Sequence, residues 1–124
     1  MQKTAILYCE ADGAVLSTQT KLFKKAGYAV VPIESRAAME SAVKLGGFDI
    51  AILGHTLTRD DRHHLPYLVK KDNPAARVVV LHASGRHPAV DVTVDSRLGE
   101  RILLEAIAQA AAEPVAAQKS CACV

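Results

Sequence analysis

The fold is decided by the stretch Phe48-Asp49-Ile50-Ala51-Ile52-Leu53-Gly54-His55-Thr56-Leu57-Thr58. Its residues 50–53 form a short unbroken apolar run, which predicts a strand that is buried on both faces. The run stops at Gly54, and a polar loop follows. In open parallel α/β sheets, ligands bind just beyond the carboxyl ends of the strands. Gly54 and His55 are therefore candidate site residues.

The rest of the chain alternates strand and helix patterns around this stretch. The predicted strands are residues 5–9, 28–33, 78–82 and 90–94, and the predicted helices are residues 14–26, 36–45 and a last helix that begins near Asp95 or Ser96 and ends at Pro114. Such alternation favours a parallel sheet with helices on its faces. Asp12 and Ser35 are expected to cap the first two helices by accepting their free N–H groups.

A further helix is expected between Thr58 and Asp72, but Pro66 lies inside that segment. A proline breaks the interior of a helix and is tolerated in its first turn. We therefore expect regular helix only from His64 or Leu65 to Lys71.

The order of the strands follows from which of them suit the edges. Pro32 cannot donate a ladder hydrogen bond, so residues 28–33 should form an edge strand. Residues 90–94 alternate apolar and polar side chains, which predicts a half-exposed edge. The other three strands are apolar throughout, so the order is 2-1-3-4-5, a doubly wound order whose crevice lies between the first and third strands. Glu10, Gly54 and His55 should line that crevice, and His82 should flank it.

Length and composition limit the classes of function. The chain has 124 residues and a net charge of +2, which predicts one domain over residues 1–112 and a flexible tail over residues 113–124. Aromatic residues make up 4% and tryptophan is absent, which argues against a nucleic-acid platform. No apolar run approaches the roughly 18 residues that a membrane helix needs. We expect a cytoplasmic protein.

The three cysteines do not predict a disulfide framework. Cys9 ends the first strand and is expected to be a reduced, partly buried thiol. Cys121 and Cys123 lie in the tail, where the ending Cys-Ala-Cys-Val formally fits a prenylation box. No polybasic segment flanks it, so we expect an exposed end without a lipid.

Four segments together resemble the receiver domain of bacterial response regulators, the CheY-like family. They are Ile-Leu-Tyr-Cys-Glu-Ala-Asp at residues 6–12, Ala-Gly-Tyr-Ala-Val at 26–30, Phe-Asp-Ile-Ala-Ile-Leu at 48–53, and Asn-Pro followed by Val-Val-Val-Leu within 73–81. The resemblance covers roughly residues 3–110. It implies a flavodoxin-like α/β fold with a doubly wound five-stranded parallel sheet and a role in two-component or phosphorelay-type signalling.

The resemblance also implies where the phosphoryl-transfer residues of a receiver would stand. The two acids that hold Mg²⁺ fall on Glu10 and Ala11, with Asp12 adjacent. The phosphoacceptor aspartate falls on Gly54. The hydroxyl residue that ends the fourth strand falls on His82, and the lysine that ends the fifth falls on Asp95.

Only Glu10 keeps the residue type that the family requires at these positions. Without a carboxylate at Gly54 no acyl phosphate forms, and Asp95 would repel phosphoryl oxygens. We therefore expect a degenerate pseudo-receiver with no catalytic residues and no cofactor, in which Mg²⁺ binding is lost or weak.

The segment between the fourth and fifth strands is short for a crossover. A crossover with its helix needs at least about 10–12 residues and usually more. Residues 84–89 hold Gly85 and Pro88 and lack helical periodicity, so the fourth helix of a receiver should be reduced or missing. This would bare one side of the sheet. We expect a protein partner or a second copy to cover the face made by the fourth strand, the fifth strand and the last helix.

Five histidines offer an alternative. Cys9, His55 and His82 end neighbouring strands, so they could surround Zn²⁺ or Ni²⁺ with Glu10 as a fourth ligand. The plainer interpretation is that His55 and His82 fill space and bond to loop carbonyls, and that His63 and His64 are exposed.

The hypothesis that the chain is an enzyme has less support. His55 with Thr56, or His82 with Ser84, can be drawn as base and nucleophile, but the sequence has no nucleophile elbow and no phosphate-binding glycine loop. The main hypothesis is a non-phosphorylatable, receiver-like protein that acts as a phosphorylation-independent interaction module and is not an enzyme. The alternative is a metal- or small-ligand-binding sensor that uses the emptied crevice.

Overall fold

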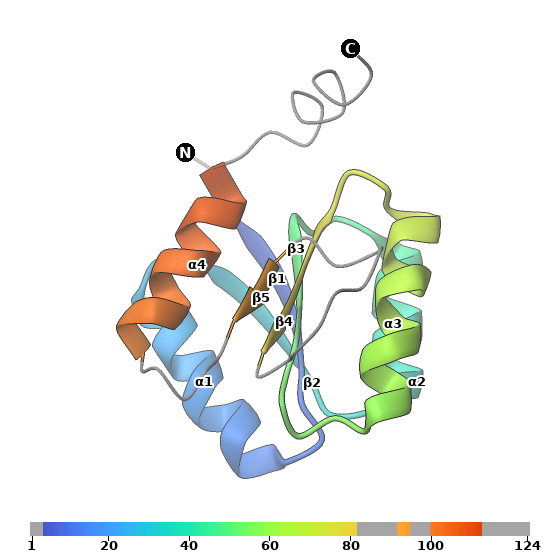
Figure 1. Ribbon diagram of the computed structural model, residues 1–124, viewed down its shortest axis with the longest axis horizontal. Helices are drawn as coiled ribbons and strands as arrows, with labels where there is room; N and C mark the ends of the chain where they lie inside the picture. The colour runs from blue at the N-terminus through green and yellow to red at the C-terminus, as the bar shows by residue number, and fades with distance from the viewer. Residues whose placement is uncertain (1–3, 82–91, 95–99, 113–124) are drawn as a thin grey trace.

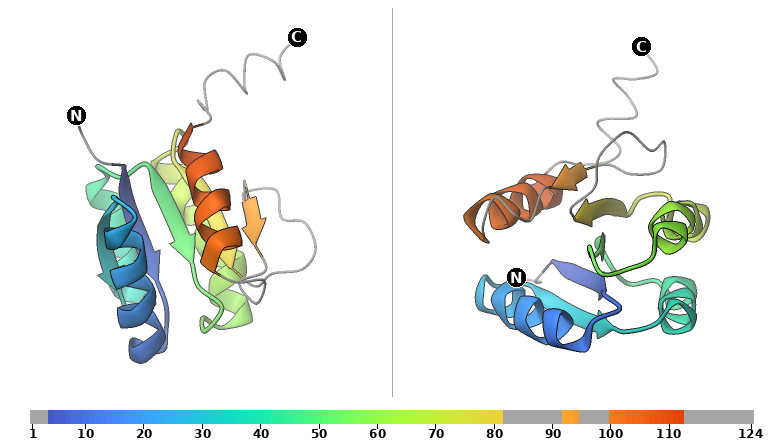
Figure 2. Two further views of the ribbon diagram at one scale, coloured as in Figure 1. Left: turned by 90° about the vertical axis from the view of Figure 1, so that its left-hand side faces the viewer. Right: turned by 60° about the horizontal axis from the view of Figure 1, so that its bottom comes forward.

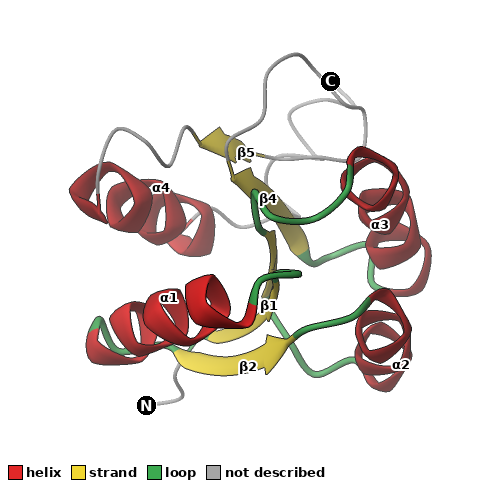
Figure 3. Ribbon diagram, turned by 90° about the horizontal axis from the view of Figure 1, so that it is seen from below, coloured by secondary structure: helices red, strands yellow, loops and turns green. Residues whose placement is uncertain are grey.

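The computed structural model describes residues 4–81, 92–94 and 100–112. Within these ranges, a five-stranded parallel sheet has the order β2-β1-β3-β4-β5. The elements are β1 (Ala5–Cys9), α1 (Gly13–Lys25), β2 (Ala29–Ile33), α2 (Arg36–Leu45), β3 (Ile50–Leu53), α3 (Arg59–Asp72), β4 (Arg77–Leu81), β5 (Val92–Val94) and α4 (Glu100–Ala112). Figures 1 and 3 show α1 and α4 on one face of the sheet and α2 and α3 on the other.

The predicted strand order and the parallel α/β architecture are confirmed. Viewed along the layers in Figure 2, the sheet separates the two helix pairs. The edge position of β2 explains how its proline is accommodated. Ala29 donates to the Thr4 carbonyl and the Ile33 carbonyl accepts from Glu10, so these residues turn their backbone groups toward β1. Strand alternation then turns the nitrogen of Pro32 to the open edge, where no ladder bond is lost.

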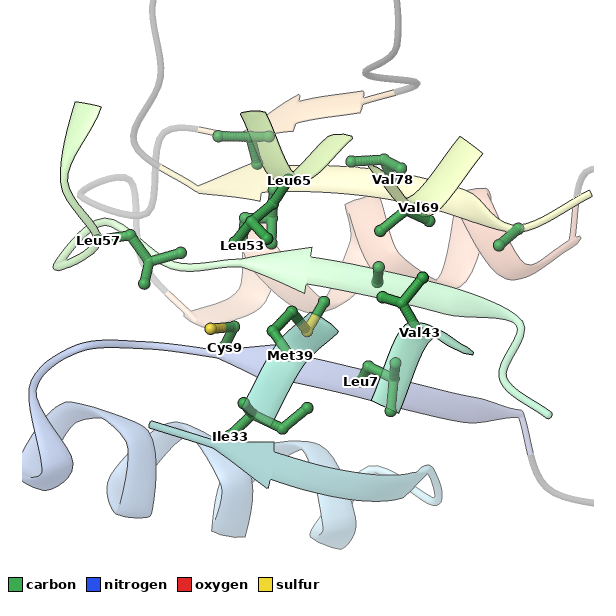
Figure 4. Packing of buried hydrophobic residues seen from close by; sticks show 13 residues of the cluster. Leu7, Cys9, Ile33, Met39, Val43, Leu53, Leu57, Leu65, Val69 and Val78 are labelled. Carbon is green, nitrogen blue, oxygen red and sulfur yellow. The ribbon is translucent and has the colours of Figure 1, made fainter. Parts of the chain in front are cut away.

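Two apolar layers flank the sheet because successive strand residues point to opposite faces. Alternate residues of β1 show this: Ile6 and Tyr8 pack under α1 and α4, and Leu7 and Cys9 pack under α2 and α3. Figure 4 shows the second layer, which includes Cys9 of β1 and Met39 of α2. All of these side chains are at most 5% exposed. The unbroken apolar runs of the central strands therefore serve two cores.

The predicted caps of the first two helices are confirmed. Asp12 Oδ1 accepts hydrogen bonds from the amides of Ala14 and Val15, at 2.8 and 3.3 Å. The Ser35 hydroxyl accepts from the amide of Ala38 at 3.2 Å. These bonds satisfy N–H groups that the first helical turn leaves without a partner.

The prediction for the third helix was wrong about its start. Helix α3 begins at Arg59, where Thr58 accepts from the amide of Asp61 at 3.1 Å, and runs through Pro66 to Asp72. Pro66 is buried in this helix. Tertiary packing and a complete N-cap thus override the local cost of an interior proline.

Several expectations lie outside the described residues. They are the reduced fourth helix, the loop at 84–89 and the tail at 113–124, together with His82, Asp95, Ser96, Cys121 and Cys123. Within the described part, no helix is long and apolar enough to cross a lipid bilayer.

Candidate functional site

The candidate site is at the carboxyl end of β1 and β3. The last paired residues of these strands are Cys9 and Leu53. One step further, Glu10 and Gly54 stand side by side, and the Gly54 amide donates to the Cys9 carbonyl at 2.8 Å. By strand alternation, both residues project to the α1 and α4 face of the sheet. The register therefore places these two predicted site residues in contact.

Glu10 is fully buried, at 0% exposure. Its Oε1 atom accepts from the amide of Thr56 at 2.9 Å and from the hydroxyl of Thr56 at 2.5 Å. Its Oε2 atom accepts from the hydroxyl of Tyr8. His55 Nδ1 lies 3.8 Å from Oε2, where a protonated imidazole would form an ion pair. A buried carboxylate is tolerated only when donors surround it, and Tyr8 and Thr56 supply them here.

Gly54 provides the space for this carboxylate. A β-carbon built on Gly54 would lie 1.7 Å from Glu10 Cδ, and 1.9 and 2.1 Å from its two oxygens. Real atoms do not approach so closely, so any side chain at position 54 would have to displace Glu10. The Glu10 carboxylate thus occupies the volume in which a side chain of residue 54 would begin.

Thr56 ties the β1–α1 loop to the β3–α3 loop. Its hydroxyl oxygen accepts from the amides of Ala11 and Asp12, at 2.9 and 3.1 Å, and donates its own hydrogen to Glu10. A hydroxyl has one hydrogen and two lone pairs, so every bonding position of this group is used. The Thr56 hydroxyl therefore has no hydrogen left for His55, with which it can be drawn as a nucleophile.

The neighbours of Glu10 add no second carboxylate to this cluster. Ala11 offers only a methyl group, and Oδ1 of Asp12 is held by the first turn of α1. Among the described residues, no three histidine, cysteine, aspartate or glutamate side chains are grouped so that they could hold a metal ion.

The prediction that Cys9 is partly buried was wrong. The residue is fully buried, at 0% exposure. Its side chain lies in the apolar layer under α2 and α3, on the opposite face of the sheet from Glu10, because the two are consecutive strand residues. Burial raises the pKa of its thiol to about 12, and the charges of Asp61 and Glu10 add to the shift. The structure thus separates Cys9 from Glu10, the fourth ligand of the suggested metal site.

Tyr8 was not predicted as a site residue. Burial raises the pKa of its phenol well above the usual value, and the hydrogen bond to Glu10 and the charge of Glu10 reinforce the shift. The phenol therefore stays protonated and acts as a fixed donor. Its ring packs edge-on against Phe23, with ring centroids 5.2 Å apart. The period of two along a strand, which puts Tyr8 on the same face as Glu10, was the available signal.

Comparisons with known proteins find likeness in structure only. No protein-family model and no curated protein matches the sequence. A response regulator receiver domain protein (CheY-like) from Methanospirillum hungatei superposes with a TM-score of 0.77 at 17% identity, over 89% of this chain and 94% of that one.

The chain has the receiver fold. Two further structures support this conclusion. A putative pilus assembly-related protein from Burkholderia pseudomallei gives a TM-score of 0.72 at 21% identity, over 88% of this chain and 90% of that one. The beryllofluoride-activated NtrC4 receiver domain dimer gives 0.67 at 17% identity, over 86% and 94%. In this receiver-like chain, the crevice at the carboxyl ends of β1 and β3 is filled by its own side chains.

Proposed function

We propose that this chain is a pseudo-receiver: a cytoplasmic, receiver-like protein of bacterial signalling that takes no phosphoryl group and acts as a phosphorylation-independent interaction module. One observation carries the proposal. Glu10 lies where a side chain of residue 54 would lie, and residue 54 is the position at which the receiver resemblance puts the phosphoacceptor. Phosphoryl transfer needs an accessible carboxylate there, and the carboxylate present is buried and hydrogen-bonded.

The electrostatics of the crevice support the same proposal. A phosphoryl group carries negative charge. The Glu10 carboxylate is also negative, and its hydrogen-bond donors, Tyr8 and Thr56, are neutral groups. Receivers offset this repulsion with Mg²⁺ held by two acids, but Ala11 stands at the second acid position. A phosphoryl donor would therefore meet an occupied and repulsive crevice.

The test of this proposal is native mass spectrometry of the purified chain with Mg²⁺ and acetyl phosphate. We expect no mass gain, whereas a receiver domain that has its acceptor aspartate gains one phosphoryl group under the same conditions. A phosphoryl adduct on this chain would overturn the proposal. A chelator-sensitive metal adduct would instead favour the alternative sensor.

The proposed interaction face is that of β4, β5 and α4. Ile102 on α4 is 39% exposed, although it is a large apolar side chain. The NtrC4 receiver, which has the same fold, is described as a dimer. The similar Burkholderia protein is described as pilus assembly-related, so assembly of larger structures is a second setting for an interaction module.

A charged residue at Ile102 should weaken association through this face, because a lysine ammonium would lose its water there. We expect Ile102→Lys to raise the dissociation constant of a dimer or complex at least tenfold. Light scattering measures the resulting shift toward monomer. Val31→Lys is the matched control, since Val31 is 52% exposed at the opposite edge of the sheet. Equal effects of the two variants would refute this choice of face.

A further inference from the structure

The groups around the Glu10 carboxylate are arranged as in a binding pocket. Three donors converge on its carboxylate: the phenol of Tyr8, the amide of Thr56 and the hydroxyl of Thr56. They come from β1 and from the loop after β3, which are far apart in sequence. Gly54 supplies the space, and Tyr8 and Glu10 are both at 0% exposure, while Thr56 is partly exposed at the mouth of the group.

We propose that Glu10 is an internal ligand of a carboxylate-binding pocket that the rest of the fold constructs. The pocket consists of Tyr8, Gly54 and Thr56, and the ligand is attached to the chain through β1. This inference rests on the proposed function, because a crevice filled by Glu10 is one that no phosphoryl group enters. It adds the chemical class that the pocket selects: a small carboxylate.

The bound carboxylate also sets the positions of two loops. Thr56 bonds to Glu10 through both its amide and its hydroxyl, and the same hydroxyl accepts from the amides of Ala11 and Asp12. Occupancy of the pocket therefore holds the β1–α1 loop against the β3–α3 loop. Since the ligand is covalently part of the chain, its effective concentration is high and the loops remain in one arrangement.

Removal of the internal ligand should leave a pocket that an external carboxylate fills. In Glu10→Ala, the missing atoms are a methylene group and a carboxylate, which acetate matches in size and charge. We expect a lower Tm for Glu10→Ala and a saturable, acetate-dependent rise of several degrees. Potassium chloride at equal ionic strength should not produce this rise, nor should benzoate, whose ring exceeds the vacated volume.

Glu34→Ala is the matched control for the acetate experiment, since Glu34 is an exposed carboxylate in the neighbouring loop. Acetate should leave its Tm and that of the native chain unchanged. A folded Glu10→Ala variant with no acetate-dependent shift would overturn the inference. So would an equal shift in Glu34→Ala, which would mean a general effect of the anion.

A second variant keeps the inference testable if Glu10→Ala does not fold. Thr56→Val removes the hydroxyl oxygen that accepts hydrogen bonds from the amides of Ala11 and Asp12. We expect hydrogen exchange at these two amides to accelerate at least tenfold, and Thr56→Ser to retain the native rates. Unchanged exchange in Thr56→Val would contradict the loop linkage.

The outcomes of these measurements can be told apart from the outcome of the phosphoryl test. A missing acetate shift defeats the internal-ligand inference and leaves the proposed function standing. A phosphoryl adduct on the native chain defeats both, because the group could enter only if Glu10 left the pocket.

Discussion

At the scale of single residues, Glu10 and Gly54 form a complementary pair. Glu10 needs the space that Gly54 leaves. The Glu10 carboxylate fills that space, so the buried glycine leaves no cavity beside it. The backbone of Gly54 does not adopt a positive φ, so backbone conformation does not require glycine here. The requirement is steric and comes from one neighbouring side chain.

Gly54→Ala should destabilise the protein by about 2–4 kcal/mol, because the new methyl group displaces a buried charged group from its donors. Urea denaturation measures the change. Gly13→Ala is the control: a β-carbon there lies 3.7 Å from Glu34, an ordinary contact, and should change stability by less than about 1 kcal/mol. In the Glu10→Ala background, Gly54→Ala should cost much less, and strict additivity would contradict the pairing.

At the scale of elements, the sequence predicted what depends on periodicity and on capping. The bounds of α2 and β3 and the strand order were confirmed, because apolar runs and the Asp12 and Ser35 caps are local signals. The start of α3 was missed, since the rule against interior prolines takes no account of the burial of Pro66. The helix forms in spite of Pro66, whose burial offsets only part of the cost of an interior proline.

Pro66→Ala should therefore stabilise the protein slightly. The change restores a helix donor and removes a ring clash worth about 3 kcal/mol, but it loses two buried methylenes at about 0.8 kcal/mol each and the rigidity of proline in the unfolded chain. We expect a net gain of about 0.5–1 kcal/mol in thermal or urea unfolding. Pro74→Ala, in an exposed turn, should give no gain. A loss above about 1 kcal/mol in Pro66→Ala would show that packing dominates.

The candidate site was predictable only in part, because local sequence signals do not specify tertiary contacts. Strand order brought Glu10, Gly54 and His55 to one edge of the sheet. The direction of the Glu10 side chain depends on donors such as Thr56, which belongs to a loop whose conformation no periodicity specifies. An empty crevice was therefore expected where the chain folds its own carboxylate inward.

At the scale of the whole molecule, one sheet supports two separate apolar layers. Tyr8 and Cys9 are adjacent in β1 but lie in different layers. Both are titratable, and burial raises the pKa of each. Ionisation at high pH would therefore place charge in both cores at once.

Stability should decline as the pH rises above about 9. The thiol of Cys9 has a pKa of about 12 in the fold against 9.0 in a solvated chain, so between these values the unfolded chain releases a proton that the fold retains. Each such group lowers the free energy of unfolding by about 1.4 kcal/mol per pH unit. Urea midpoints at pH 7, 9 and 10 measure the decline. Cys9→Ala should show a shallower slope, and identical slopes would rule out this thiol as a contributor.

The interlocked pair has a consequence for how the sequence can change. One nucleotide substitution converts a glycine codon to an aspartate codon, so an acid at position 54 is genetically close. The side chain would enter space that Glu10 occupies, and two negative groups would then share one dry pocket. An acid at position 54 would therefore require the Glu10 carboxylate to leave its donors, at a cost in stability. While Glu10 keeps its present position, selection for stability therefore acts against any side chain at position 54.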